Sequence, residues 1–156
     1  MERKTKLDAP AGKPELLILR DFDLPIDLLF RAYTEADIVE EWMGNKVLRL
    51  DNFPQGAWRF EATDPKGNVH KFNGTIHEFV PESKITRTFE MEGAGVGIQL
   101  EFIEFEALTE DTSRLRMHIV YRSVEHRDKM IQFGMDWGMN AAHNRLEKTA
   151  IRFKAI

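Results

Sequence analysis

Hydrophobic and polar residues change their spacing along the chain, and each change predicts a different type of element. Glu15–Phe22 is apolar and rich in β-favouring residues, which predicts a first strand. Apolar residues then recur at helical spacing over Ile26–Tyr33, and again in a second short segment that stops at Gly44. Asp23 and Thr34 stand where a side chain commonly caps a helix. The first third therefore predicts one strand followed by two short, capped helices.

From Lys46 onward, apolar and polar residues alternate with a period of two, as in half-buried strands. Short turn sequences separate the segments, so consecutive strands should pair antiparallel. The stretch 102–105 blurs the alternation and predicts a bulge where the sheet bends. The predicted strands are Val47–Leu50, Ala57–Thr63, Val69–Val80, Ser83–Met91, Val96–Leu108 and Arg114–Ser123.

The end of the chain returns to helical spacing, which predicts one long helix from Val124 to about Phe153. At ~1.5 Å per residue this helix would be about 45 Å long. The longest predicted strands reach ~40 Å, so such a helix matches the length of the sheet. If the sheet curls around it, a cavity can remain between them. The order of elements predicts an α+β domain over residues 15–154, preceded by a flexible tail over residues 1–14.

The alternation also predicts which strand residues face the interior. One face of the strands carries large apolar side chains, and they fit either a packed core or the wall of a cavity. The opposite face carries polar residues, among them Gln99 and Glu101, and is expected to meet solvent. The predicted inward residues include Trp58, Phe60, Phe72, Ile76, Leu100, Phe102, Met117 and Ile119.

Several short motifs recur in an order and spacing that resemble a known family. They are Arg20-Asp21-Phe22-Asp23-Leu24-Pro25, Leu29-Phe30-Arg31-Ala32-Tyr33-Thr34, Glu41-Trp42-Met43-Gly44, Gly56-Ala57-Trp58-Arg59-Phe60, Asp64-Pro65-Lys66-Gly67, Gly74-Thr75-Ile76-His77-Glu78-Phe79-Val80-Pro81 and Gly134-Met135…Gly138…Leu146. Together they resemble the START/Bet v-like (SRPBCC) superfamily, and within it the branch named after the C-terminal domain of the heat shock protein 90 ATPase activator. The resemblance implies a helix-grip fold, in which a bent antiparallel sheet, with two short helices after the first strand, wraps around a long C-terminal helix. It also implies a chaperone as one kind of partner.

Composition narrows the choice of function. The chain has 156 residues, no cysteine and a formal charge of −4 at pH 7. The lack of cysteine excludes disulfides, thiolate nucleophiles and cysteine metal ligands. The negative charge argues against a nucleic-acid partner, and no stretch approaches the ~20 apolar residues of a membrane span. We expect a cytoplasmic protein that is a monomer or a weak homodimer.

Patterns for catalysis are sparse. The five histidines lack metal-ligand spacing and the serines fall at strand ends or turns, so the sequence predicts no metal, no cofactor and no catalytic residue. His143 and Glu78 are the two side chains that could serve as an acid or base in a cavity. Each also has an ordinary structural explanation, as a buried hydrogen-bonded histidine and a solvated outer carboxylate.

The preferred function is binding of a small apolar molecule, such as a lipid, an isoprenoid or a polyketide-like compound, between the sheet and the last helix. The alternatives are a cyclase- or dehydratase-like enzyme that uses the same cavity, and the chaperone-interacting module that the resemblance implies. Gly134 and Gly138 could leave room for a ligand, or allow close approach of helix and sheet. The predicted pocket residues are Trp42, Trp58, Phe60, Phe72, Ile76, Leu100, Phe102, Met117, Ile119, Met135, Gly138, Met139 and His143.

Overall fold

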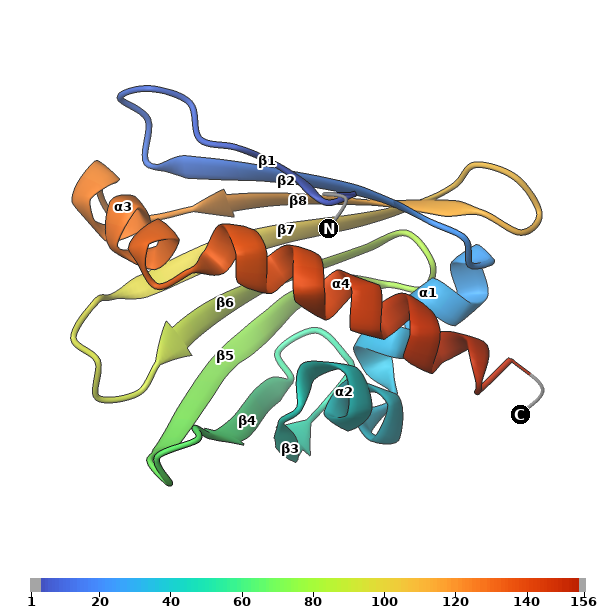
Figure 1. Ribbon diagram of the computed structural model, residues 1–156, viewed down its shortest axis with the longest axis horizontal. Coiled ribbons are helices and arrows are strands. Elements are labelled where there is room, and N and C mark those ends of the chain that lie inside the picture. The colour runs from blue at the N-terminus through green and yellow to red at the C-terminus, as the bar shows by residue number, and fades with distance from the viewer. Residues whose placement is uncertain (1–3, 155–156) are drawn as a thin grey trace.

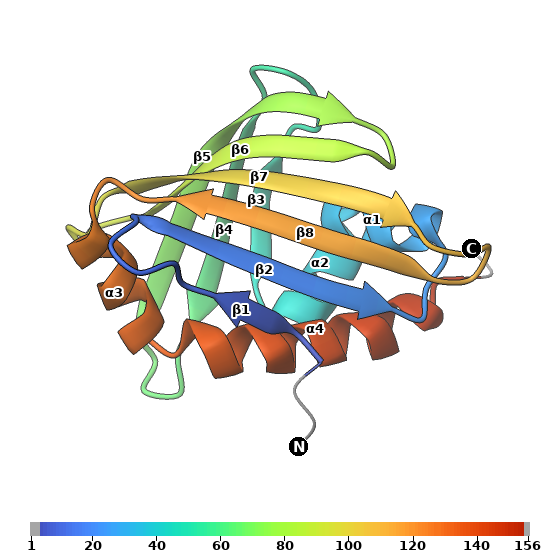
Figure 2. The same ribbon diagram turned by 90° about the horizontal axis from the view of Figure 1, so that it is seen from above.

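Eight strands form one antiparallel sheet that bends around a long C-terminal helix (Figure 1). The strand order is β1-β2-β8-β7-β6-β5-β4-β3. Strand β2, near the start of the chain, therefore pairs with β8, the last strand in sequence. Helix α4 crosses the inner face of the sheet, and α1 and α2 cover one end of that face (Figure 1). Figure 2 shows β3, β4 and β5 turning away from the direction of β7 and β8, so that the sheet curls toward the helices. This is the predicted α+β helix-grip architecture.

The computed structural model describes residues 4–154, without the side chains of residues 136 and 137. No helix in this described part is long and apolar enough to cross a membrane. The strands are β1 Lys6–Asp8, β2 Glu15–Phe22, β3 Lys46–Leu50, β4 Ala57–Thr63, β5 Val69–Val80, β6 Lys84–Met91, β7 Ile98–Ala107 and β8 Ser113–Val120. The helices are α1 Ile26–Thr34, α2 Ala36–Met43, α3 Val124–Gln132 and α4 Met135–Ile151.

The two short helices lie where the apolar spacing predicts them, but their N-terminal caps differ from the prediction. The cap positions are Pro25 and Glu35, and neither supplies a side-chain hydrogen bond to the helix. Asp23 lies too early to cap α1, and the hydroxyl of Thr34 donates back to a carbonyl of α1 at 3.0 Å. Gly44 ends α2 in the left-handed conformation, as predicted (φ 68°).

The prediction of a single C-terminal helix over Val124–Phe153 is wrong, because the structure divides this segment into α3 and α4. Gly134 lies between them with φ +86°, a conformation that interrupts a right-handed helix. Ser123 caps α3, and its hydroxyl oxygen accepts a hydrogen bond from the backbone N–H of His126 at 3.1 Å. The break turns α3 away from the axis of α4 (Figure 2).

The structure places a strand where the sequence predicts a flexible tail. Lys6–Asp8 form β1 and pair antiparallel with β2, with Leu7 opposite Ile18. Just before this strand, the backbone N–H of Thr5 donates to Asn140 Oδ1 at 3.0 Å. The N-terminal segment is therefore joined to β2 and to α4, which composition alone does not reveal. Residues 1–3 of the predicted tail lie outside the described residues.

The bulge predicted at residues 102–105 is also wrong. The register of β7 runs without a shift against both neighbours, β6 and β8. The register shifts instead between Val47 and Arg49 in β3, and between Ile76 and Glu78 in β5. Bulges increase the local twist and bend of a strand, and these two lie in the half of the sheet that turns away in Figure 2.

An uninterrupted β7 reverses the predicted faces of that strand. Ile103 is fully buried on the inner face, and side chains alternate strictly along a strand without a bulge. Gln99 and Glu101 therefore lie on the inner face and are buried. Leu100 and Phe102 lie on the outer face, so their prediction as inward residues is wrong. The reversal brings two polar side chains beneath the helices.

The core on the inner face sits mostly between the sheet, α1 and the second half of α4. Phe30 of α1 packs edge-on against Phe105 of β7, with ring centroids 5.1 Å apart, and Leu146 of α4 is fully buried. Trp58 lies close over Gly74 of the neighbouring strand, where a Cβ atom would meet the Trp58 indole nitrogen at 2.4 Å. The first half of α4 is packed less closely, and the space beneath it is the candidate site.

Candidate functional site

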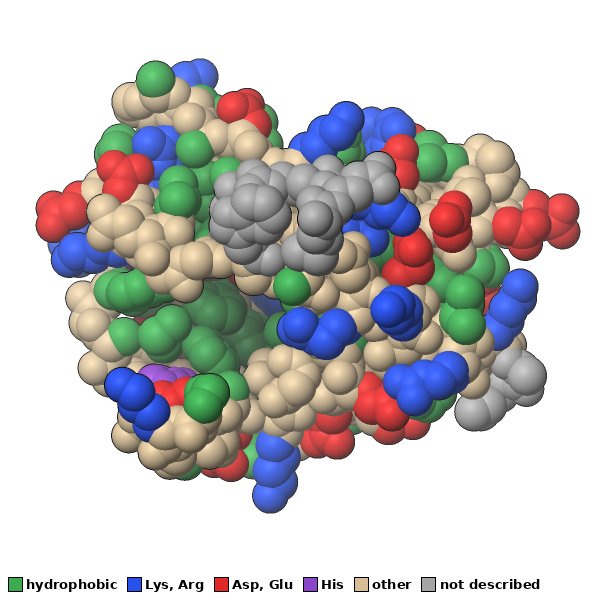
Figure 3. Space-filling view, in the orientation of Figure 1, with side chains coloured by type: hydrophobic (Ala, Val, Ile, Leu, Met, Phe, Trp, Pro, Cys, Tyr) green, Lys and Arg blue, Asp and Glu red, His purple; other side chains and the backbone are tan. Residues whose placement is uncertain are grey.

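A cavity of about 370 Å³ lies between the inner face of the sheet and the α3–α4 segment. It is open to the surface, and Figure 3 shows its mouth as a hollow lined with apolar side chains. Phe133, in the turn between α3 and α4, lines it and is 62% exposed. The lining residues are Tyr33, Trp42, Met43, Phe72, Arg87, Phe89, Met91, Gln99, Glu101, Met117, Ile119, Met130, Phe133, Gly134, Met135, Gly138, Met139 and Ala142.

Methionine is the most frequent residue of this lining. Six of the seven methionines in the sequence contribute to it, and they come from α2, β6, β8, α3 and α4. Methionine is unbranched and polarizable, so a wall made from it adapts to ligands of irregular shape. The wall is therefore suited to contact apolar molecules of different shapes, and less suited to select one particular shape.

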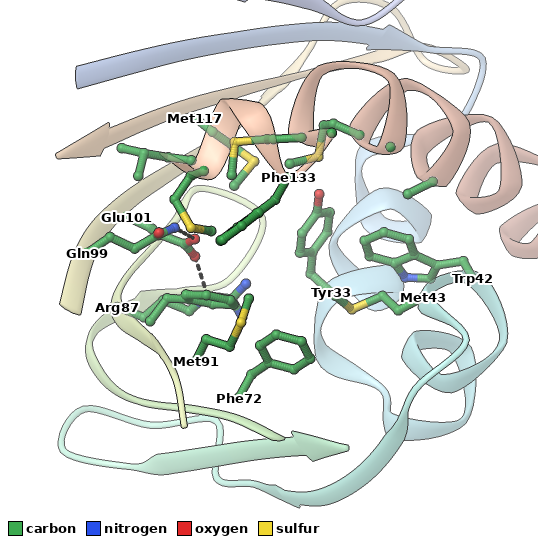
Figure 4. A pocket seen from close by; sticks show the side chains of 18 residues that line it. Tyr33, Trp42, Met43, Phe72, Arg87, Met91, Gln99, Glu101, Met117 and Phe133 are labelled. Carbon is green, nitrogen blue, oxygen red and sulfur yellow. Dashed lines mark hydrogen bonds and ion pairs between the residues drawn. The ribbon is translucent and has the colours of Figure 1, made fainter. Parts of the chain in front are cut away.

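Three polar side chains form a connected cluster in this apolar wall (Figure 4). Arg87 Nε donates to Glu101 Oε1 at 2.9 Å, and Gln99 Nε2 donates to Glu101 Oε2 at 2.9 Å. The side chains of Arg87 and Glu101 are only 10% and 6% exposed. The guanidinium also lies over the ring of Trp58, 4.7 Å from its centroid. Two neighbours thus hold Arg87 in place at the edge of the cavity.

Tyr33 of α1 approaches the same space from the helical side (Figure 4). Its ring packs against Trp42 and Phe105, with centroid distances of 5.3 and 5.5 Å. Burial raises the pKa of the Tyr33 phenol above its usual value, while the charge of Arg87 acts in the opposite direction. The phenol therefore keeps its proton at neutral pH and is available as a hydrogen-bond donor.

The structure separates the predicted pocket residues into those that line the cavity and those that do not. Trp58, Phe60 and Ile76 are buried in the core, Leu100 and Phe102 lie on the outer face of the sheet, and His143 is buried elsewhere. Whether the lining members contact a ligand stays a prediction. The predicted residues that line the cavity are Trp42, Phe72, Met117, Ile119, Met135, Gly138 and Met139.

The sequence pattern does not predict the polar cluster. It places Gln99 and Glu101 on the outer face of β7, which is wrong, and Arg87 lies opposite Glu101 in the register of β6 with β7. The burial of Ile103 identifies the inner face of β7, since strict alternation from it carries that face back to Glu101 and Gln99, but the local sequence pattern does not reveal this burial. For Tyr33 the sequence predicts only a place on the apolar face of the first short helix.

The two side chains considered as an acid or base do not reach the cavity. His143 is fully buried, and its Nδ1 lies 2.8 Å from the hydroxyl of Thr5. Burial lowers the pKa of His143 to about 3. Glu78 lies on the outer face, where its carboxylate bonds to Lys84 at 2.8 Å and Thr86 at 2.6 Å. Neither residue is placed for chemistry inside the cavity.

A metal centre is equally without support in the described part of the chain, where no three His, Asp or Glu side chains are grouped to hold an ion. Arg87 and Glu101 neutralise each other, and the remaining walls are apolar. The arrangement can enclose an apolar body and offer hydrogen-bond donors at one place on its wall.

The comparisons with known proteins agree on the fold. The family model described as Activator of Hsp90 ATPase homolog 1-like protein matches residues 23–150. A protein from Arthrobacter aurescens, solved by NMR, superposes with a TM-score of 0.85 at 16% identity, over 94% of this chain and 91% of that chain. A crystal structure of a Rhodobacter sphaeroides protein gives a TM-score of 0.83 at 18% identity, over 97% and 99% of the two chains. A Nitrosomonas europaea protein gives 0.81 at 19% identity, over 95% and 100%. No curated protein matches the sequence.

Proposed function

The chain belongs to the Activator of Hsp90 ATPase homolog 1-like family, and on that premise we propose that it binds a small, largely apolar molecule between the sheet and α4. The observation that carries the proposal is the open cavity of about 370 Å³ with its methionine and aromatic lining. Its volume falls within the range of small-molecule sites, roughly 300–1,000 Å³. Lipids, isoprenoids and polyketide-like compounds have the required apolar surface.

The cavity can supply affinity through burial alone. Each methylene group removed from water contributes about 0.8 kcal/mol, so a ligand with ten such groups gains several kcal/mol after the entropy loss of binding. Met117 and Met139 face this space from the sheet and from α4 and can change rotamer to fit different ligands. The proposal therefore concerns a class of ligands that share an apolar body.

A fluorescence titration with N-phenyl-1-naphthylamine, followed by displacement with a farnesol, fatty-alcohol and aromatic-polyketide panel, tests the proposal. Gly138 offers a matched pair of variants, because a Cβ atom there meets nothing within 4 Å and the residue lines the cavity. We expect Gly138→Leu to weaken probe binding at least tenfold by filling the space, and Gly138→Ala to bind nearly as the wild type does. Absence of binding by the probe and by the whole panel would reject the function.

A second function follows from the family description, which names an activator of the Hsp90 ATPase. The reversed face of β7 favours it, because Ile98 is 56% exposed on the outer surface, beside Leu100 and Phe102. Apolar side chains grouped on a surface are common at protein interfaces. Turnover of ATP by an Hsp90 chaperone, measured with and without this protein, tests the role. A rise that Ile98→Ser abolishes would support it, and unchanged turnover would reject it.

The remaining expectations concern the protein in the cell. A cytoplasmic location stays a prediction, as does the monomeric or weakly dimeric state. The sheet ends in β1 and β3, and a dimer would form most simply by pairing at one of these edges.

A further inference from the structure

We propose that the ligand carries an uncharged hydrogen-bond acceptor, such as a ketone, aldehyde or ester carbonyl, and that Arg87 and Tyr33 recognise it. This inference rests on the proposed binding function and specifies the chemistry of the ligand. It follows from the donors that face the cavity without a partner, and from the charge balance around them.

Arg87 has N–H groups that no described residue accepts. A guanidinium has five N–H groups, and the one on Nε bonds to Glu101. No described residue accepts a hydrogen bond from Nη1 or Nη2, although the side chain lines the cavity. The Trp58 ring beneath the guanidinium and the carboxylate beside it fix its plane. The Nη1 and Nη2 groups of a fixed guanidinium are therefore available to a ligand in the cavity.

Tyr33 supplies a second donor to the same space. Its hydroxyl has no hydrogen-bond partner among the described residues, while the ring is held between Trp42 and Phe105. Figure 4 shows Tyr33 entering the cavity from the helical side and Arg87 entering it from the sheet side. Both Arg87 and Glu101 act electrostatically on the Tyr33 phenol, as expected for groups around one small space. An acceptor on a ligand in this space would replace water as the hydrogen-bond partner of these donors.

The charge balance argues for an acceptor without charge. Glu101 already neutralises Arg87 at 2.9 Å, and Gln99 holds the other carboxylate oxygen. A ligand carboxylate would leave one net negative charge in a site whose other walls are apolar, and removing that charge from water carries a large penalty. A carbonyl oxygen accepts the same hydrogen bonds without this penalty.

Three naphthalenes of nearly equal shape test the inference. 2-Acetylnaphthalene has the carbonyl, 2-isopropenylnaphthalene replaces its oxygen with a methylene group, and 2-naphthoate has the carboxylate. We expect the ketone to bind roughly tenfold more tightly than the alkene, the difference that one or two net hydrogen bonds provide. We expect the carboxylate to bind more weakly than the ketone at pH 7. Dissociation constants from tryptophan fluorescence give both ratios.

Two variants assign the preference to the named residues. Tyr33→Phe removes only the hydroxyl, and Arg87→Met combined with Glu101→Gln removes the charge pair without leaving a buried charge unpaired. We expect the ketone-to-alkene ratio to fall in each variant, toward one in the double substitution. Equal wild-type affinities for ketone and alkene would overturn the inference and leave the binding function intact. A ratio that both variants preserve would also overturn it, as would failure of all three compounds to bind a protein that binds the naphthylamine probe.

Discussion

The buried His143 makes the stability of the fold depend on pH in a predictable direction. Its Nδ1 lies 2.8 Å from the Thr5 hydroxyl, which also accepts a hydrogen bond from Arg20 Nη1 at 3.1 Å. While its oxygen accepts from Arg20, the Thr5 hydroxyl can donate its proton to Nδ1 in the neutral form of His143. Burial and the nearby Arg20 charge both favour this neutral form and lower the pKa of His143 from 6.5 to about 3.

The sign and size of the effect follow from linkage. Below pH 6.5 the unfolded chain takes up a proton at this residue and the folded chain does not, so unfolding becomes more favourable as the pH falls. The free energy of unfolding then decreases by up to ~1.4 kcal/mol per pH unit between pH 6.5 and 3. From pH 7 to pH 5 we expect a loss of about 2 kcal/mol from His143.

Urea denaturation at pH 7 and pH 5 measures this loss. His143→Gln removes the titrating group, so its free energy of unfolding should fall by about 2 kcal/mol less than that of the wild type over the same interval. Burial also lowers the pKa of His126, and the comparison of variant with wild type cancels that contribution. His77→Gln, on an exposed position of β5, controls for loss of a histidine. Equal losses in the wild type and His143→Gln would refute the reasoning.

Two further predictions concern glycines and are read from urea denaturation at pH 7. Gly74→Ala should destabilise the protein by about 3 kcal/mol, because its Cβ would lie 1.9 Å from the Thr88 carbonyl oxygen; a change within 0.5 kcal/mol would contradict this packing. Gly134→Ala should destabilise by roughly 1–2 kcal/mol because of the left-handed backbone, whereas Gly138→Ala, in the helix with open space around its Cβ, should stabilise by up to ~1 kcal/mol. Changes of the same sign at these two positions would show that the break between α3 and α4 is misplaced.

Most of the fold could be predicted from the sequence because its signals are local. The strand β2 has the predicted bounds Glu15–Phe22, and β4 and β5 also match their predicted ranges. The break in the last helix could not be predicted in this way, since glycine is tolerated inside helices and only the positive φ of Gly134 decides the outcome. The position of Thr5, just before β1, also escapes local patterns, because its partners Asn140 and His143 lie more than 130 positions away.

The site was harder to predict because β7 is apolar in both phases of its alternation. Ile98, Leu100 and Phe102 form one apolar series, and Ile103 and Phe105 form the other. Local pattern cannot choose between them. Packing does, since Phe105 lies against Phe30 and Tyr33 of α1. Because side chains alternate along the strand, Gln99 and Glu101 lie on the same inward face as Ile103 and Phe105. The polar cluster of the cavity therefore depends on the packing of Phe105, near the other end of β7.

The hydrogen bonds of Thr5 to Asn140 and His143 span 135 and 138 residues of sequence. Contacts between residues so far apart in sequence form late, because both segments must be present before they can close. During synthesis, the part of the concave face beneath α4 therefore stays uncovered until α4 has left the ribosome. Until then its methionine and aromatic side chains are open to water and to other chains, which favours aggregation of the nascent chain.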